Sequence, residues 1–449
     1  MKVRTLVAIL LCLGECLAQK RLDVTSVASY LDPYVRSNNF AGDILIEENG
    51  KVLFEKAYGF ANREKEIRDT TASRFHVASV SMQFTAAAVL RLVDKGSLRL
   101  GTHVSDLVPG ISGGNRITVR DLLLERSGLP DINDLPGYTK VLESHQTPDS
   151  LIAQIKDRAL LFEPGSKFLH EEHSAYNLLA LIVEKKTGLP FAAAMQKLVF
   201  RPVGLSNSSI DDDALPSGSG VAEGYRPEGV EGLEHAAAIH WSAKTGNASM
   251  VTTAHDEARF IRAMFGDHFL KPLSRNEILD TLPRVGYGWM RSASERYHGT
   301  IYYMNGRAPG FSSFVVYLPR ERLSVIVFSN IYSSATTRIG YDLAAIFLGL
   351  PYEPFLPGGS ALSEEQLHSC AGTFIFGPDF YQPNAEVTLI DDGLMLSMRW
   401  PSGDISPFIP LKADHFVDRS YWEEVRVERD AAGSSQSILY GRFRGIRKQ

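Results

Sequence analysis

Strand-forming sequence lies near the start of the chain and again far along it, and helix-forming sequence lies between. Residues 42–46 and 51–59 are two strand-like runs joined through an Asn-Gly pair, which tolerates the positive φ angles of a tight hairpin. Residues 313–317 and 323–329 are two more such runs, separated by a charged turn. This order favours an antiparallel sheet that both groups of strands complete and that helices cover, which is an α+β fold.

Two apolar segments between these strands predict buried helices. Residues 84–93 are Ala-rich and apolar, and Ser79 lies at the N-terminal end of this segment. Residues 176–186 form a second apolar run, which Gly188 closes at a position that suits a left-handed C-cap. We therefore expect an antiparallel sheet flanked by helices, with a helical subdomain inserted in it.

A Pro-Gly-Gly-Ser stretch near residue 360 is typical of a linker. The alternating runs beyond it predict strands over residues 387–390, 394–400, 415–417 and 437–443. We expect a main domain over residues 19–355 and a small all-β, barrel-like domain over residues 361–449.

The first 18 residues have the pattern of a signal peptide. Lys2 and Arg4 give a positive start, residues 6–13 are apolar, and residues 16–18 end in a small-residue cleavage pattern. An apolar stretch this short cannot cross a bilayer, which needs roughly 20 residues. We predict export to the periplasm or the exterior, with lipid attachment at Cys16 left open.

Charge and cysteine content narrow the possible partners. The formal net charge of -5 is spread along the chain without basic clusters, so we expect no nucleic-acid partner. Two of the three cysteines lie in the signal segment, which leaves Cys370 alone in the mature chain and allows no intrachain disulfide. The oligomeric state stays open.

Residues 75–87 carry a resemblance to a known family. They resemble the nucleophile helix of class C β-lactamases, D-alanyl-D-alanine carboxypeptidases and related esterases, in which Ser-x-x-Lys opens a buried helix. A spacing of three places both side chains on one helix face, so that the Lys amine can take the Ser proton. Here Ser79 is kept as the nucleophile, and the Lys position is occupied by Met82.

The second motif of the family is altered. Residues 121–130 end in the Ser-Gly-Leu-Pro string that the family shares, and Pro-Gly before the motif and Tyr-Asn after it also match. The family has Tyr-Ser-Asn between these flanks. This chain has Glu171, Glu172 and His173, with one extra residue.

The third motif is altered as well. The family has Lys-Thr-Gly or His-x-Gly before a Pro-Gly-Phe turn, and this chain has Met304, Asn305 and Gly306. By resemblance, these residues and Arg307 form the substrate-binding strand, and the backbone N–H groups of Ser79 and Arg307 form the oxyanion hole. The resemblance covers most of residues 25–350 and implies the fold of this family.

The resemblance implies acyl-serine chemistry through Ser79 on a β-lactam, a D-alanyl peptide or a small ester, without cofactor or metal. The replaced Lys, Tyr and cation predict impaired catalysis, because general-base assistance is typically worth about 10²- to 10⁴-fold. Two alternatives remain. His173, with Glu171, Glu172 or His170, could rebuild a base, or the protein could be a non-catalytic pseudoenzyme that binds a peptidoglycan-like or acyl ligand.

Overall fold

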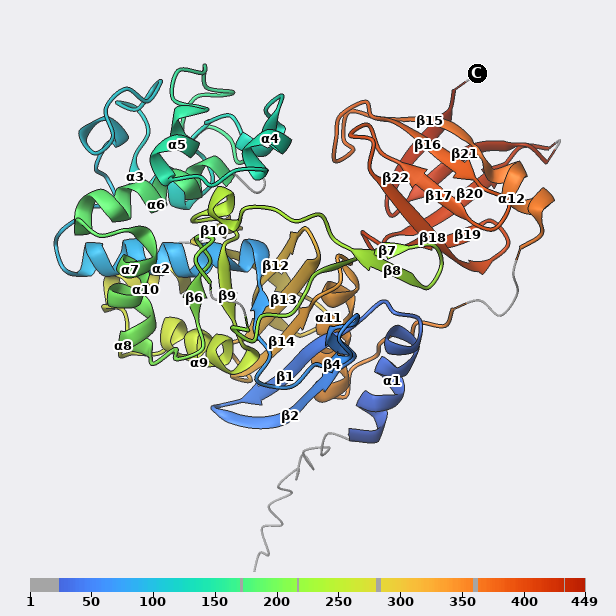
Figure 1. Cartoon of the computed structure of the whole chain (residues 1–449), viewed down its shortest axis with the longest axis horizontal. Coiled ribbons are helices and arrows are strands. Elements are labelled where there is room, and N and C mark those ends of the chain that lie inside the picture. The colour runs from blue at the N-terminus through green and yellow to red at the C-terminus, as the bar shows by residue number, and fades with distance from the viewer. Residues whose placement is uncertain are drawn as a thin grey trace, which may run out of the picture.

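A seven-stranded antiparallel sheet forms the centre of the N-terminal part of the chain, in the order β10-β11-β12-β13-β14-β1-β2 (Figure 1). The computed structural model describes residues 24–169, 173–215, 218–279, 284–357, 362–431 and 433–448. The strands of the sheet are β1 (Gly42–Glu48), β2 (Lys51–Tyr58), β10 (Val285–Gly286), β11 (Trp289–Ser294), β12 (Gly299–Ala308), β13 (Phe311–Leu318) and β14 (Leu323–Ser329).

The sheet joins strands from distant parts of the sequence. β1 pairs antiparallel with β14, so that Ile46 lies opposite Val325. β1 and β2 are connected by the predicted tight turn, in which Asn49 and Gly50 have φ angles of 51° and 83°. The prediction of an α+β fold with an antiparallel sheet is therefore confirmed.

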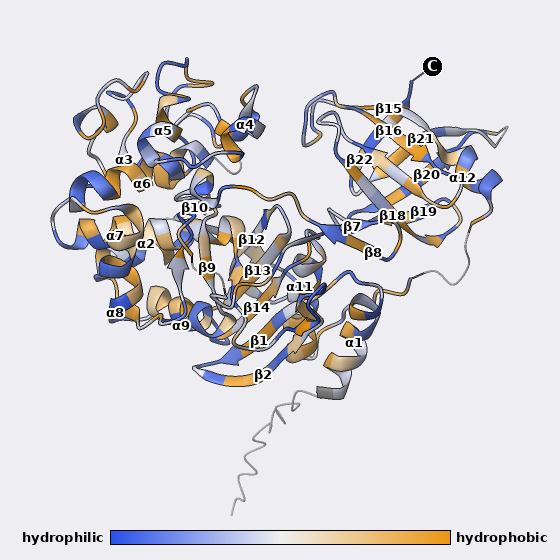
Figure 2. Cartoon of the chain, viewed as in Figure 1, coloured by the Kyte–Doolittle hydropathy of each residue, from blue (hydrophilic) through white to orange (hydrophobic). Residues whose placement is uncertain are grey.

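Helices cover both faces of this sheet. Helices α1 (Val24–Arg36) and α11 (Ala335–Leu348) share one hydrophobic core with one face, and α2 (Ser81–Asp94) and α9 (Ala254–Phe265) share a larger core with the other. Figure 2 shows hydrophobic residues concentrated on β12, β13 and β14 between these layers. Burial of these faces is the main source of the stability of the N-terminal part.

Further helices form a subdomain beside the sheet, as the sequence predicts (Figure 1). They are α3 (Val119–Leu123), α4 (Tyr138–Leu142), α5 (Pro148–Ala153), α6 (His173–Thr187), α7 (Phe191–Met195), α8 (Arg201–Val203) and α10 (Pro272–Leu279). The predicted helices at residues 84–93 and 176–186 lie within α2 and α6. Gly188 follows α6 with a φ of 67°, as a left-handed C-cap requires.

Short strands connect these layers. They are β3 (Phe60–Asn62), β4 (Ile67–Arg68), β5 (Phe75–His76), β6 (Ser209–Ile210), β7 (Tyr225–Glu228), β8 (Gly232–His235) and β9 (Met250–Thr252). They form the pairs β3-β4 and β7-β8 and the three-stranded sheet β5-β9-β6.

The C-terminal part is a closed eight-stranded barrel, preceded by the short helix α12 (Glu364–Cys370). Its strands are β15 (Gly372–Phe376), β16 (Glu386–Asp391), β17 (Leu396–Arg399), β18 (Ile405–Lys412), β19 (His415–Asp418), β20 (Glu424–Arg429), β21 (Ser435–Tyr440) and β22 (Phe443–Arg447). The predicted small all-β part is confirmed. The run at residues 437–443 is not one strand, because a turn at Gly441 (φ 57°) divides it between β21 and β22.

Two predictions fall outside the described residues or stay untested. The proposed signal peptide, residues 1–18, lies outside them, and so do residues 358–360 of the predicted linker. The domain division at residues 355 and 361 therefore stays a prediction. Within the described ranges, no helix combines the length and the apolarity needed to span a bilayer.

Candidate functional site

Ser79 lies in a strained turn at the start of α2. The turn is the 3₁₀ helix η1 (Ala78–Val80), and Ala78 has a φ of 48°, a left-handed conformation that costs an alanine roughly 1–2 kcal/mol. The preceding residue, Val77, is bonded on both sides: its N–H donates to the Met250 carbonyl at 3.1 Å, and its carbonyl accepts from Ser313 Oγ at 2.7 Å. Strands β9 and β13 therefore hold the turn that presents Ser79.

The third-motif strand lies directly against this turn. β11 pairs with β12 only as far as Tyr303, so residues 304–308 continue beyond β11 and approach η1. At Gly306 a Cβ atom would stand 2.8 Å from Ser79 N and 2.6 Å from the Val77 carbonyl oxygen, distances that no side chain tolerates. Glycine at this position brings the strand backbone beside the Ser79 amide. The arrangement suits two N–H donors that face one developing oxyanion.

No positive charge occupies the two positions where the family has cations. Met82 and Met304 are 0% and 2% exposed, and both belong to the large core between α2 and the sheet. Ser79 itself is 3% exposed, and its hydroxyl makes no hydrogen bond within the part of the chain that the structure describes. A hydroxyl without a base beside it is a weak nucleophile at neutral pH.

The second-motif position holds a hydrogen-bonded pair, His173 and Asp131, whose side chains are 14% and 7% exposed. Glu171 and Glu172, like His170, lie outside the described residues, whereas His173 begins α6. The backbone N–H of His173 donates to Asp131 Oδ2 at 2.8 Å, and its ring Nδ1 lies 3.0 Å from the same oxygen. Burial raises the pKa of Asp131, but the charge and the hydrogen bonds of His173 outweigh this effect and hold the pKa below its usual range. A carboxylate thus orients the imidazole of His173.

Lys244 extends this pair into a larger polar group. Its Nζ lies 3.4 Å from Asn133 Oδ1 and 4.9 Å from the centroid of the Tyr138 ring, and Asn133 Nδ2 lies 2.9 Å from His173 Nδ1. Lys244 is only 9% exposed, at the end of the 3₁₀ helix η5 (Trp241–Lys244). Asp131, Asn133, His173 and Lys244 are called the second-motif cluster below.

Sequence reasoning missed most of the second-motif cluster. Asp131, Asn133 and Lys244 were not predicted as site residues. The one available signal was position, because Asp131 directly follows the shared Ser-Gly-Leu-Pro string.

His76, three residues before Ser79, supports the site without forming part of a base. Its Nε2 lies 2.8 Å from Asp211 Oδ2, and its ring is stacked on Trp241 at 3.6 Å between centroids. Burial lowers the pKa of His76 in spite of the bond to Asp211, so the ring is neutral at pH 7. These contacts are those of a hydrogen-bonded structural histidine.

The Arg307 side chain contacts the barrel. Its guanidinium carbon lies 4.0 Å from the centroid of the Tyr421 ring and 5.2 Å from that of Tyr332. Its Nη1 also donates to the Ser420 carbonyl at 3.4 Å. The strand that carries the third motif is thus attached to the C-terminal part of the chain.

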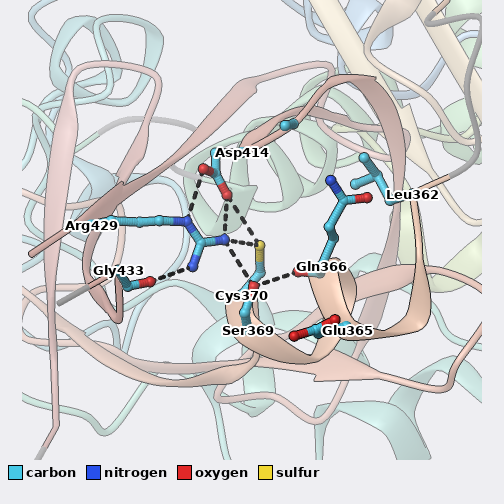
Figure 3. A pocket seen from close by; sticks show the side chains of 9 residues that line it. Leu362, Glu365, Gln366, Ser369, Cys370, Asp414, Arg429 and Gly433 are labelled. Atoms are coloured by element: carbon cyan, nitrogen blue, oxygen red, sulfur yellow. Dashed lines mark hydrogen bonds and ion pairs between the residues drawn. The ribbon is translucent and has the colours of Figure 1, made fainter.

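Two cavities lie elsewhere, and neither includes Ser79. One, of about 320 Å³, is in the barrel, where the guanidinium of Arg429 is bonded to Asp414, Cys370, Ser369 and the Gly433 carbonyl (Figure 3). The other, of about 260 Å³, is lined mainly by Tyr297, Tyr303, Tyr341 and two serines.

Within the described ranges no three His, Cys, Asp or Glu side chains are arranged to hold a metal ion.

Comparison with known proteins finds matches over most of the chain. The family model described as Beta-lactamase matches residues 27–347. Penicillin-binding protein 4* of Bacillus subtilis (strain 168) is 26% identical over 341 residues, which are 70% of this chain and 74% of that protein.

Solved structures show the same fold. The octameric penicillin-binding protein homologue from Pyrococcus abyssi has a TM-score of 0.66 at 20% identity, and the match covers 95% of this chain and 100% of that one. The D-amino acid amidase from Ochrobactrum anthropi SV3, complexed with D-phenylalanine, has a TM-score of 0.61 at 19% identity, over 69% of this chain and 91% of that one.

Proposed function

Because the chain belongs to the beta-lactamase family of serine hydrolases, we propose that it forms an acyl-enzyme at Ser79 slowly, on a β-lactam, a D-alanyl peptide or a small ester. One observation carries this proposal. Gly306 brings the third-motif strand against the Ser79 amide, so the oxyanion-binding backbone persists where the proton-transferring side chains are replaced. The expected activity is therefore acyl transfer with electrostatic stabilisation and little base assistance.

The reaction has a defined order of bond changes. The Ser79 oxygen attacks the carbonyl carbon while its proton passes to water or to His173, and the tetrahedral intermediate then collapses as the amide or ester bond breaks and the leaving amine or alcohol takes up a proton. Water then hydrolyses the acyl-serine ester, which releases the acid and returns the hydroxyl to Ser79. Backbone N–H donors stabilise the oxyanion, a term that mutagenesis elsewhere puts at about 10²- to 10³-fold per donor. Proton removal is the step without a dedicated amine, because Met82 and Met304 cannot accept a proton. Acylation is thus expected to be the slow step.

The second-motif cluster supports residual activity. A histidine whose Nδ1 is held by a carboxylate has Nε2 as its proton-accepting nitrogen, which is the logic of a base with an orienting partner. His173 and Asp131 have this relation in the tautomer whose proton is on Nδ1, which lies 3.0 Å from Asp131 Oδ2; in the other tautomer Nδ1 accepts from Asn133 Nδ2 at 2.9 Å. We propose that His173, in the first of these tautomers, assists Ser79 weakly.

A second candidate function is binding without turnover. It is favoured by the 3% exposure of Ser79 and by the apolar side chains at positions 82 and 304. In that case the region around Ser79 binds a peptidoglycan-like peptide or another acyl ligand, and no covalent adduct forms. Neither function requires a cofactor or a metal.

Acylation of the purified full chain separates the two functions. Wild type and Ser79→Ala are incubated with a fluorescent penicillin and a fluorophosphonate, and turnover of a chromogenic cephalosporin and a p-nitrophenyl ester is followed. We expect slow labelling and slow turnover that both disappear in Ser79→Ala. Turnover that survives the substitution would exclude chemistry through Ser79, whereas a ligand-induced rise in melting temperature without any adduct would establish binding alone.

We further propose that residues 1–18 direct export and are then removed, so that the protein works in the periplasm or outside the cell. The proposal rests on the charge and apolar pattern of this segment. N-terminal sequencing of the exported protein should begin at Gln19. A mature chain that begins at Cys16 would instead indicate lipid attachment.

A further inference from the structure

We propose that residues 418–422 of the barrel, called the clamp segment, position the third-motif strand at Ser79 through Arg307. The barrel would then be a working part of the acyl-transfer site. The consequence for acylation rests on the function proposed above, whereas the positioning itself does not. The contacts of the clamp segment with both parts of the chain carry the inference.

Hydrogen bonds to Asp418 hold the clamp segment in place within the barrel. Asp418 is fully buried at the end of β19, and its Oδ1 accepts from the N–H groups of Ser420 and Tyr421 at 2.8 and 3.0 Å. Its Oδ2 accepts from the Tyr440 hydroxyl at 3.0 Å, which ties the segment to β21. A buried carboxylate with three donors fixes the backbone that carries Tyr421.

The clamp segment is also bonded to the N-terminal part. Arg419 is fully buried, and its guanidinium donates to Asn39 Oδ1 at 2.8 Å and to the carbonyls of Gly229 and Gly232 at 2.6 and 3.0 Å. In the opposite direction, Ser333 Oγ donates to the Arg419 carbonyl at 2.6 Å. The segment is thus held from both sides, and Figure 1 shows the β7-β8 hairpin beside this end of the barrel.

Tyr421 connects the clamp segment to the third-motif strand through Arg307. Its ring faces the guanidinium of Arg307 at 4.0 Å, and the neighbouring Ser420 carbonyl accepts from Arg307 Nη1 at 3.4 Å. Arg307 directly follows Gly306, where a Cβ atom would lie 2.8 Å from Ser79 N. Residues 304–308 are paired with β13 along one edge, but their other edge has no β11 partner beyond Tyr303, so the side-chain contacts of Arg307 add to the backbone pairing that positions this strand end.

Hydrogen–deuterium exchange of the full chain tests the positioning without reference to activity. The variant Tyr421→Leu removes the ring that faces Arg307, Tyr421→Phe keeps it, and Tyr352→Leu makes the same change at an exposed tyrosine outside the barrel. We expect amide exchange over residues 302–308 to become about tenfold faster in Tyr421→Leu, given the usual strength of a partly buried cation–π contact. Exchange should stay at the wild-type rate in the other two variants.

Fluorophosphonate labelling of the same variants tests the consequence for chemistry. The maximal labelling rate of Ser79 should fall about tenfold in Tyr421→Leu, with reagent affinity within about twofold, and Tyr421→Phe should restore it. Unchanged exchange over residues 302–308 in Tyr421→Leu would overturn the positioning role. Faster exchange in a protein whose wild type is never labelled would uphold the positioning role and reject the proposed function instead.

Discussion

The side chain at position 82 decides how a proton can leave Ser79. A thioether fills the volume of a lysine stem in the core but accepts no proton, and Met82 is fully buried. An amine at that position would need a carboxylate or hydroxyl partner to remain charged in the core. In the third motif Met304 stands where the family has a cation, and in the second motif the described residue His173 is hydrogen-bonded to Asp131. The effect of replacing the family lysine at position 82 is therefore coupled to the replacements in the second and third motifs.

Replacing Met82 by lysine should not restore efficient catalysis. In Met82→Lys we expect p-nitrophenyl ester turnover to rise less than about tenfold, because the family phenol and third-motif cation are still missing. The free energy of unfolding should drop by about 2–4 kcal/mol in urea denaturation, since a charge enters an apolar core. Met82→Leu, which conserves volume, is the control and should change neither quantity appreciably. A rise in turnover of a hundredfold would show that the other two losses matter little.

Glu257 predicts a pH dependence of stability. The side chain is 0% exposed on α9, neither carboxylate oxygen has a partner among the described residues, and burial raises its pKa to about 8, with a smaller contribution from Asp256. The unfolded chain has a pKa near 4.3 here, so the folded state alone holds the proton between these values. The contribution to stability is complete below about pH 4 and is lost as the pH rises through about 8.

Glu257→Gln should remove this loss. At pH 8.5 we expect the variant to exceed wild type in free energy of unfolding by on the order of 2–4 kcal/mol, and to show a smaller decline between pH 5 and 8.5, as urea titrations at several pH values would measure. Glu143→Gln makes the same change at an exposed position and should follow the wild-type curve. A Glu257→Gln curve that parallels wild type would contradict the assignment.

At the scale of elements, the close approach of β12 to η1 requires a glycine at position 306. In Gly306→Ala the new Cβ would meet the Val77 carbonyl, Ser313 Oγ and Ser79 N at 2.6–2.8 Å, so the strand must move away from η1. We expect Ser79 labelling to fall at least about tenfold and the free energy of unfolding by about 1–3 kcal/mol. Gly299→Ala, on the same strand, meets no atom nearer than 3.9 Å and is the control. Equal labelling of both variants would exclude a close approach at Gly306.

Helices and strands whose apolar residues follow a clear pattern were predictable from the sequence, whereas contacts between distant segments were not. The runs at residues 42–46 and 323–329 predict strands because they are apolar and bounded by turn residues, and they are β1 and β14. β18 was not predicted, because Pro407 and Pro410 interrupt its apolar pattern and proline is uncommon inside a strand. Ser79 and Gly306 were found through motif positions. Asp131 and Asn133 contact His173, and Lys244 contacts Asn133, only in the folded chain. No spacing in the sequence predicts these contacts.

At the scale of the whole molecule, one buried arginine joins the barrel to the rest. Burial lowers the pKa of Arg419 to about 10, so it stays charged at neutral pH, and its guanidinium donates hydrogen bonds to carbonyl groups and to the Asn39 side chain. A lysine cannot place donors in the same fork. The junction therefore depends on the geometry of the guanidinium as well as on its charge.

Arg419→Lys should weaken the junction. We expect the free energy of unfolding to fall by about 2–4 kcal/mol, and calorimetry to resolve separate transitions for the barrel and the N-terminal part. Arg444→Lys, at a half-exposed barrel position, is the control and should melt like wild type. If Arg419→Lys kept the wild-type melting temperature, the guanidinium would contribute nothing essential to the junction.

The pairing of β1 with β14 has a consequence for biosynthesis. A ribosome that has made β1 and β2 must still translate everything up to β14 before the central sheet can close. At about 5–20 residues per second, that delay lasts on the order of tens of seconds. Throughout it the nascent hairpin carries an unsatisfied edge, which gives chaperones a long interval in which to hold the polypeptide unfolded.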